Sequence, residues 1–124
     1  MRRISHSALR VILDRHGLWL ENDIAGIKAD LREANLSGVD LREANLSEAN
    51  LREANLDMSA IPLSCGSLRM KIDNRLAIQL LFHALKNIQY SDYVDSDLKS
   101  LLLTPEILSW ANQFHRPDVE RLTL

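Results

Sequence analysis

Leucine recurs at every fifth position through the middle of the chain, and this is its most regular hydrophobic pattern. Residues 29–63 read ADLRE, ANLSG, VDLRE, ANLSE, ANLRE, ANLDM and SAIPL. The apolar positions at the centre of these pentapeptides are Leu31, Leu36, Leu41, Leu46, Leu51, Leu56 and Ile61. Two positions before each of them stands a small residue, most often alanine. We predict that the leucines and Ile61 form the core of the repeat.

A period of five residues fits neither an α-helix nor a plain strand. Five residues turn an α-helix by about 500°, so successive leucines would spread around the cylinder. In a strand, residues five apart lie on opposite faces. The Asp, Asn, Ser and Gly residues between the leucines favour corners, because they bond to their own backbone or tolerate unusual dihedral angles. The pattern therefore predicts a chain that turns a corner in every pentapeptide and winds into a solenoid with its leucines inside.

This run resembles the pentapeptide-repeat proteins, whose motif is a small residue, Asp or Asn, Leu and two further residues. The resemblance implies a mainly β solenoid, the right-handed quadrilateral β-helix, with about two coils for residues 29–63. Four pentapeptides complete one coil in that fold, so residues twenty apart should stack. Arg32 would then lie against Arg52 and Glu33 against Glu53, with pairing between the Arg and Glu columns.

The residues before the repeat, 1–28, are predicted to form an N-terminal helical cap. Apolar residues at helical spacing indicate a helix from Ser7 to Leu20, with serines suited to its N-cap. Its expected position covers the open end of the first coil. The sequence around Trp19 also resembles the N-terminal cap of phage- and prophage-borne pentapeptide proteins.

The residues after the repeat, 64–124, are predicted to be helical. Asp73 is a candidate N-cap for a helix to about Asn87, whose apolar residues form a full stripe. A shorter helix is expected near Leu101, and Thr104 followed by Pro105 indicates the start of another. These helices exceed what a minimal cap needs. They are expected to form a small subdomain or a homodimer interface.

Composition and charge narrow the class of protein. The aromatic share is only 5%, against 23 leucines, so the core is expected to be aliphatic and few rings remain to stack on bases. The net charge of −2 gives no basic field for direct nucleic-acid or membrane binding. No apolar run approaches the length of a membrane span. A single cysteine, Cys65, is typical of a reducing compartment. These features predict a soluble, cytoplasmic domain.

The motifs of common catalytic and metal sites are absent from the sequence. There is no glycine-rich phosphate loop, no HExxH and no CxxC, and the four histidines are scattered. We expect His83 to be a packing or surface residue and Cys65 to be a small buried thiol rather than a nucleophile. The Asp and Asn residues of the repeat are better explained by bonds to the corner backbone than by calcium binding. We therefore predict a non-enzymatic protein with no catalytic residue, metal or cofactor.

Two functional hypotheses remain. Some pentapeptide proteins resemble duplex DNA in shape and charge and thereby inhibit or shield DNA gyrase. The resemblance therefore suggests a phage-type protein-interaction module that inhibits a host DNA-processing enzyme as a partial DNA mimic. Residues 29–63 hold 3 basic and 7 acidic residues, a balance of −4. The candidate partner-binding residues are Asp30, Glu33, Asp40, Glu43, Glu48, Glu53 and Asp57. The alternative is a structural or assembly module that dimerises through its C-terminal helices.

Overall fold

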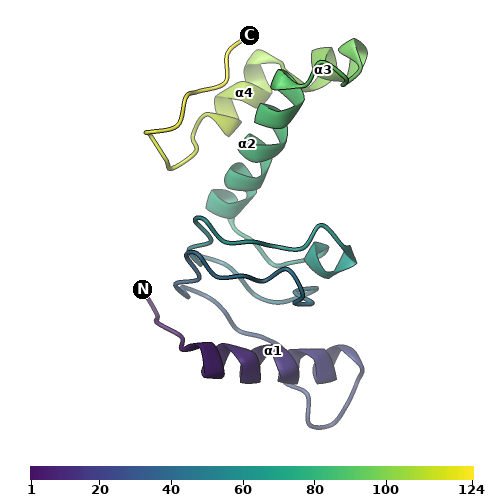
Figure 1. The fold of residues 1–124 in the computed structure, drawn as a ribbon, viewed down its shortest axis with the longest axis vertical. Coiled ribbons are helices and arrows are strands. Elements are labelled where there is room, and N and C mark those ends of the chain that lie inside the picture. Colours follow the sequence, from purple (N-terminus) through teal and green to yellow (C-terminus); the bar gives the residue numbers. More distant parts are fainter. The chain divides into compact units, whose positions relative to one another are not determined.

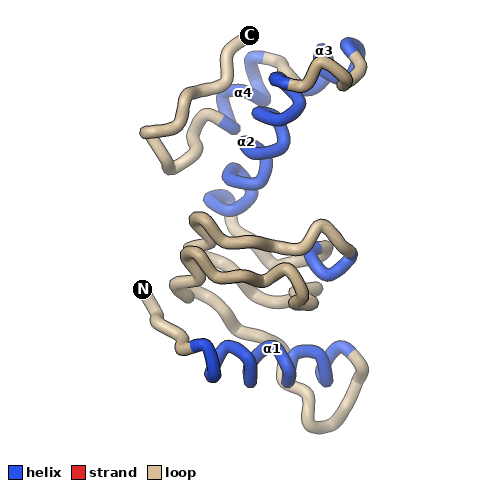
Figure 2. Tube along the Cα trace, viewed as in Figure 1, coloured by secondary structure: helices blue, strands red, loops and turns tan.

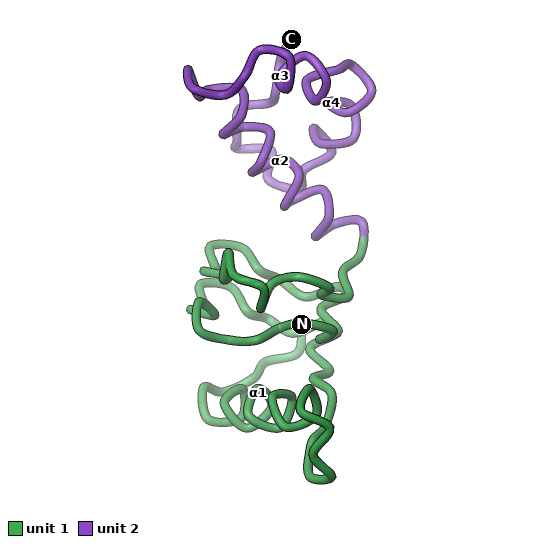
Figure 3. The backbone as a smooth tube through the Cα atoms, turned by 90° about the vertical axis from the view of Figure 1, so that its right-hand side faces the viewer, with its two compact units in different colours: residues 1–73 green, residues 74–124 purple.

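The computed structural model describes all 124 residues and contains four α-helices (Figure 1). These are α1 (His6–Leu20), α2 (Asn74–Tyr90), α3 (Ser96–Leu102) and α4 (Pro105–Ala111), with a short 3-10 helix, η1, at Cys65–Ser67. The chain forms two compact units, residues 1–73 and residues 74–124 (Figure 3). The division into residues 1–28, 29–63 and 64–124 that the sequence suggests stays a prediction. The two compact units divide the chain elsewhere, after residue 73.

Helix α1 begins where a serine can cap it. The hydroxyl of Ser5 accepts a hydrogen bond from the backbone N–H of Ala8 at 3.1 Å, which satisfies one of the free amides of the first turn. Leu9 and His16 are its buried residues. Within the first unit, α1 lies across one end of the repeat segment in two perpendicular views (Figures 1 and 3).

The repeat segment stacks upon itself every twenty residues, but it contains no β-strand. Parallel pairing is confined to isolated bridges, among them Asp30 with Asn50 and Asn35 with Asn55. Figure 2 shows this segment as loop throughout. The prediction of a mainly β fold, a right-handed quadrilateral β-helix or solenoid, is therefore wrong. The physical reason is that each pentapeptide turns a corner, so too few consecutive residues are extended to form a continuous ladder.

The corners combine two backbone features. At each of six Asp or Asn residues, the side-chain oxygen accepts the backbone N–H two residues further on. The last residue of several pentapeptides then adopts a left-handed conformation, with φ of 59° at Glu33, 71° at Gly38 and 62° at Glu53. The prediction that Asp and Asn form the corners through backbone bonding is thus confirmed. Because these corners repeat, the exposed residues after each leucine project from equivalent places.

Stacking continues past the last recognisable pentapeptide. The N–H of Leu46 donates to the carbonyl of Gly66 at 2.7 Å, and Asn50 forms a parallel bridge with Lys71. One additional residue enters between Ala60 and Gly66, because the N–H of Leu41 donates to a carbonyl nineteen residues on and that of Leu46 to one twenty residues on. We call residues 29–71 the repeat stack. It extends beyond Leu63 because its hydrogen bonds join backbone groups and do not require the consensus side chains.

The second unit has a core of its own. It is built from Phe82 and Leu85 of α2, Leu108 and Ala111 of α4, and Phe114 and Leu122 of the C-terminal segment. The rings of Phe82 and Phe114 stack with centroids 4.7 Å apart. Thr104 caps α4 by accepting the N–H of Ile107, and Pro105 occupies the first turn. The C-terminal segment is held against α4 by two hydrogen bonds between the Asn112 amide and the backbone of Leu122.

Candidate functional site

The apolar side chains of the repeat lie inside the first unit. The six repeat leucines are buried, with exposed fractions from 0% to 8%, and Ile61 is half-buried. Ala29, Ala34, Ala49 and Ala54 are buried beside them. The polar and charged residues that follow the leucines therefore stand on a densely packed support.

Two of the predicted partner-binding carboxylates are neutralised by a neighbouring arginine. Asp30 accepts from Nε and Nη2 of Arg32 at 2.9 and 2.8 Å, and Asp40 accepts from the same atoms of Arg42 at the same distances. The Arg32 guanidinium holds the pKa of Asp30 far below its usual range. The hydrogen bond from Arg42 lowers the pKa of Asp40 to about 2. Both carboxylates are exposed, yet each carries its own counter-charge.

The remaining carboxylates are placed in several ways. Glu48 is half-buried and lies 3.8 Å from a guanidinium nitrogen of Arg69. Asp57 is half-buried and makes further contacts. Three glutamates, Glu33, Glu43 and Glu53, are exposed, and their carboxylates form no hydrogen bond or ion pair. The structure thus leaves scattered glutamates rather than the uniform acidic surface that a DNA mimic requires.

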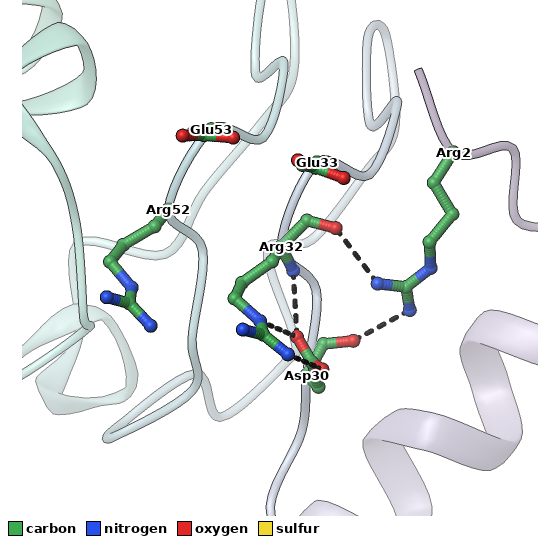
Figure 4. A pocket seen from close by; sticks show the side chains of 6 residues that line it. All are labelled: Arg2, Asp30, Arg32, Glu33, Arg52 and Glu53. Carbon is green, nitrogen blue, oxygen red and sulfur yellow. Dashed lines mark hydrogen bonds and ion pairs between the residues drawn. The ribbon is translucent and has the colours of Figure 1, made fainter.

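The arginines and glutamates stack along one edge of the repeat stack (Figure 4). The N–H of Glu33 donates to the carbonyl of Arg52 at 3.0 Å, which confirms the twenty-residue register. Arg32 and Arg52 border an open hollow of about 450 Å³ together with both glutamates. The predicted pairing between the Arg and Glu columns is wrong, because Arg32 binds Asp30 of its own pentapeptide and no guanidinium reaches Glu33 or Glu53.

Arg2 closes the outer side of this hollow, although nothing in the sequence pattern marked it. Its guanidinium donates to the carbonyls of Arg32 and Asp30 at 2.9 and 2.7 Å. The backbone N–H of Arg2 donates to the carbonyl of Glu33 at 2.9 Å, and Arg2 thereby adds a parallel bridge with Ala34. These contacts join residues about thirty apart, so no local sequence signal could reveal them.

A second recess runs along α1. It consists of two adjoining hollows of about 590 and 500 Å³, which share Arg10, Leu13 and Asp40. We call it the α1 groove. Its apolar lining is Leu9, Leu13, Leu18, Val39, Leu41 and Ala44, and its charged lining is Arg10, Asp14, Glu21, Asp40, Arg42 and Glu43. Both walls belong to the first unit, so folding of that unit forms the groove.

His16 fastens α1 to the repeat stack. The side chain is wholly buried, its Nδ1 accepts the N–H of Ala29 at 3.0 Å, and its Nε2 lies 2.8 Å from the carbonyl oxygen of Ser47. Because the amide can only donate, Nδ1 is unprotonated and Nε2 carries the proton that bonds Ser47. In the sequence this histidine is one of four scattered histidines. Only its place on the buried side of α1, beside Trp19, could have marked it.

The single cysteine is exposed rather than buried. Cys65 opens η1, where Ser64 accepts the N–H of Gly66 and the chain turns a tight corner. The prediction of a buried thiol is therefore wrong, because this corner turns the side chain to solvent. His83 is exposed, with its ring edge-on to Phe114. No group of three or more His, Cys, Asp or Glu side chains is arranged to hold a metal ion. None of the helices has the length and apolarity to cross a membrane.

These features describe a repeat scaffold that displays charged side chains at regular corners. Residues 28–60 match the family model described as pentapeptide repeats (8 copies), so the repeat of this chain is a member of the pentapeptide-repeat family. No curated protein and no solved structure matched the chain. Pentapeptide repeats are in general protein-interaction modules, and the family is generally non-catalytic.

Proposed function

We propose that this protein is a non-catalytic interaction module that holds a segment of a partner protein in the α1 groove. The observation that carries the proposal is the group of apolar side chains that lines both hollows of that groove. Leu13, Leu18 and Val39 are only partly covered along it. Covering these side chains removes apolar surface from water, which favours association by about 25 cal/mol per Å².

The rim of the groove indicates the chemistry of the partner. Asp40 and Arg42 neutralise each other through their ion pair, so they contribute little net field. Asp14, Glu21 and Glu43 then outnumber the remaining cation, Arg10. We therefore expect a partner segment that carries basic side chains beside apolar ones. Complementary charge acts mainly on the rate of encounter, so salt should slow association.

Charge reversal at the rim tests this proposal. Full-length protein with Glu43→Lys or Asp14→Lys would be used to capture partners from the native cell extract. The matched control is Asp92→Lys, an exposed residue of the second unit with the same change of charge. We expect a partner retained by the wild-type and control proteins to be lost with both rim variants. Equal capture by all four proteins would contradict the groove as the partner site.

The narrower hypothesis of a phage-type gyrase inhibitor has no support in the comparisons. The ion pairs of Asp30 and Asp40 also reduce the exposed negative charge on which DNA mimicry depends. The combined change of Glu43, Glu48 and Glu53 to Gln tests the acidic repeat surface directly. Unchanged partner binding in that variant would exclude a role for these carboxylates. A cytoplasmic location stays a prediction that rests on the single cysteine.

A second candidate function, assembly through the second unit, is favoured by one observation. Six large apolar residues there are between 45% and 98% exposed, namely Tyr90, Tyr93, Leu98, Leu101, Trp110 and Leu124. A second copy of the chain is one occupant that would cover them. Sedimentation velocity of the wild-type protein and of Leu101→Glu would test whether two copies assemble through these residues. A monomeric wild-type protein at high micromolar concentration would exclude it.

A further inference from the structure

The third arginine of the repeat lacks the partner that the first two have. Arg32 and Arg42 each follow an aspartate by two residues and form a two-point ion pair with it. Arg52 occupies the equivalent position, but the residue two before it is Asn50. Its Nε donates to Oδ1 of Asn50 at 3.1 Å, and the guanidinium forms no second bond with that side chain.

An asparagine cannot replace the missing carboxylate. Its amide nitrogen occupies the place of the second oxygen and is itself a donor, so it offers nothing to the outer guanidinium nitrogens. The charge of Arg52 is therefore uncompensated within its own pentapeptide. Glu53 does not neutralise it either, since the two side chains point apart and form no ion pair (Figure 4).

Two further cations share a hollow with Arg52. This recess of about 320 Å³ is lined by Lys28, Asn50, Arg52, Lys71 and Ile72, and no carboxylate lines it. Lys28 is oriented by Trp19, whose ring centroid lies 5.3 Å from its Nζ. Lys71 is placed by backbone hydrogen bonds with Ala49 and Leu51 at 2.8 Å each. None of the three cations forms an ion pair.

We propose that this hollow binds a doubly charged oxyanion, namely a phosphate group. Guanidinium and ammonium groups are the usual phosphate ligands in proteins, and several donors around one anion strengthen each other through charge-assisted hydrogen bonds. A single carboxylate would leave two of the three positive charges uncompensated, so a dianion fits the site better. The site lies outside the α1 groove and does not depend on it.

The first test is a titration of the full-length protein with inorganic phosphate, at constant ionic strength maintained with sodium chloride. Two-dimensional NMR should show saturable shifts at the amides of residues 28, 52 and 71 and at the Nε–H of Arg52. Arg52→Gln should weaken binding by about tenfold or more, the effect of one charge-assisted hydrogen bond. The matched control, Arg42→Gln, removes an equal charge from a paired arginine and should leave binding unchanged.

A sharper variant keeps all three cations. Asn50→Asp restores the pattern of the first two arginine repeats and should engage Arg52 in an ion pair like that of Arg32. We expect it to weaken phosphate binding as much as Arg52→Gln does. Full binding by Asn50→Asp, equal loss in Arg42→Gln, or shifts that do not saturate would each overturn the proposal.

Two further ligands distinguish the possible sources of the phosphate group. A phosphoserine peptide that binds more tightly than inorganic phosphate, and competes with it, would identify a phosphorylated protein as the source. Equal binding of the two would identify free phosphate or a small phosphate ester. Tighter binding of a single-stranded oligonucleotide than of either ligand would overturn the proposal in favour of a nucleic-acid surface.

Discussion

The two units of this protein are stabilised by different means. In residues 1–73, segments twenty residues apart pair through their backbones, and the interior repeats one side chain, leucine. In residues 74–124, unlike side chains fit together, and two stacked phenylalanines lie at the centre. The first arrangement depends on spacing, whereas the second depends on the identity of each residue.

The two units therefore differ in how much change of sequence each tolerates. Backbone pairing does not need particular side chains, so the stack runs on to Lys71 after the consensus has ended. The helices of the second unit instead need specific residues at their ends, such as Asp95 and Thr104. A repeat therefore tolerates drift of its motif, while the helical unit should be sensitive at its few aromatic and capping positions.

The largest effect is expected from a charge in the repeat interior. Leu46→Lys places an ammonium where the wild-type side chain is wholly buried, and Leu41→Lys does the same one repeat earlier. We expect the first unit to lose cooperative folding, a cost of about 5 kcal/mol or more. Urea denaturation measures it, with Ile24→Lys at a fully exposed position of the same unit as the control. A soluble Leu46→Lys protein that melts like the wild type would refute the inward placement.

Removal of an aromatic ring should disrupt the second unit more selectively. Phe82→Ala deletes a buried ring that stacks on Phe114, and such truncations cost about 3–5 kcal/mol. Hydrogen exchange should show lost protection in α2 and α4, with the repeat stack still protected. Equal loss of protection in both units would show that they fold as one cooperative body.

Replacement of the buried histidine tests the attachment of α1 to the stack. His16→Phe keeps the bulk of the side chain but leaves the N–H of Ala29 and the carbonyl of Ser47 without partners. We expect a loss of about 2–4 kcal/mol in unfolding free energy. His6→Phe, at an exposed position, is the control. A difference below about 0.5 kcal/mol between the two variants would mean that solvent satisfies both groups.

The left-handed corners predict opposite effects for two substitutions. Gly38→Ala puts a Cβ on a residue with φ of 71°, and we expect a loss of about 1 kcal/mol, although the added atom meets nothing within 4 Å. Glu33→Gly removes a side chain from an equivalent corner and should be neutral or stabilise by up to about 1 kcal/mol. Thermal denaturation of both variants measures the two changes in stability. A destabilised Glu33→Gly would contradict their equivalence.

The smallest effect concerns the exposed ion pair of Asp40 and Arg42. The pKa of Asp40 is lowered from 3.8 to about 2, so the carboxylate contributes stability that is present above pH 3.8 and lost as pH falls to 2. Asp40→Asn should therefore lower the melting temperature slightly at pH 5–7, with the difference vanishing near pH 2. Arg42→Gln should remove the same pH-dependent contribution to stability. A difference that grows toward acid would reverse the assigned sign.

Sequence reasoning worked best where a signal is local. The five-residue period, the corner role of Asp and Asn, and the start of α4 at Thr104 and Pro105 can all be read from neighbouring residues. It went wrong where the outcome depended on length or on distant contacts. The corners leave too few extended residues for strands, and the contacts of Arg2 and His16 join segments about thirty residues apart. The basic hollow was also missed, because Lys28, Arg52 and Lys71 converge only after the chain has wound.

The two hydrogen bonds of His16 also fix how α1 is aligned with the stack. A shift of one residue would turn the helix by about 100° and move it by about 1.5 Å, so both bonds would be lost together. The imidazole therefore fixes the alignment of α1 on the repeat stack, because an alignment shifted by one residue keeps neither hydrogen bond. One inserted residue between Leu9 and His16 would separate the ring from the buried leucine that shares its face.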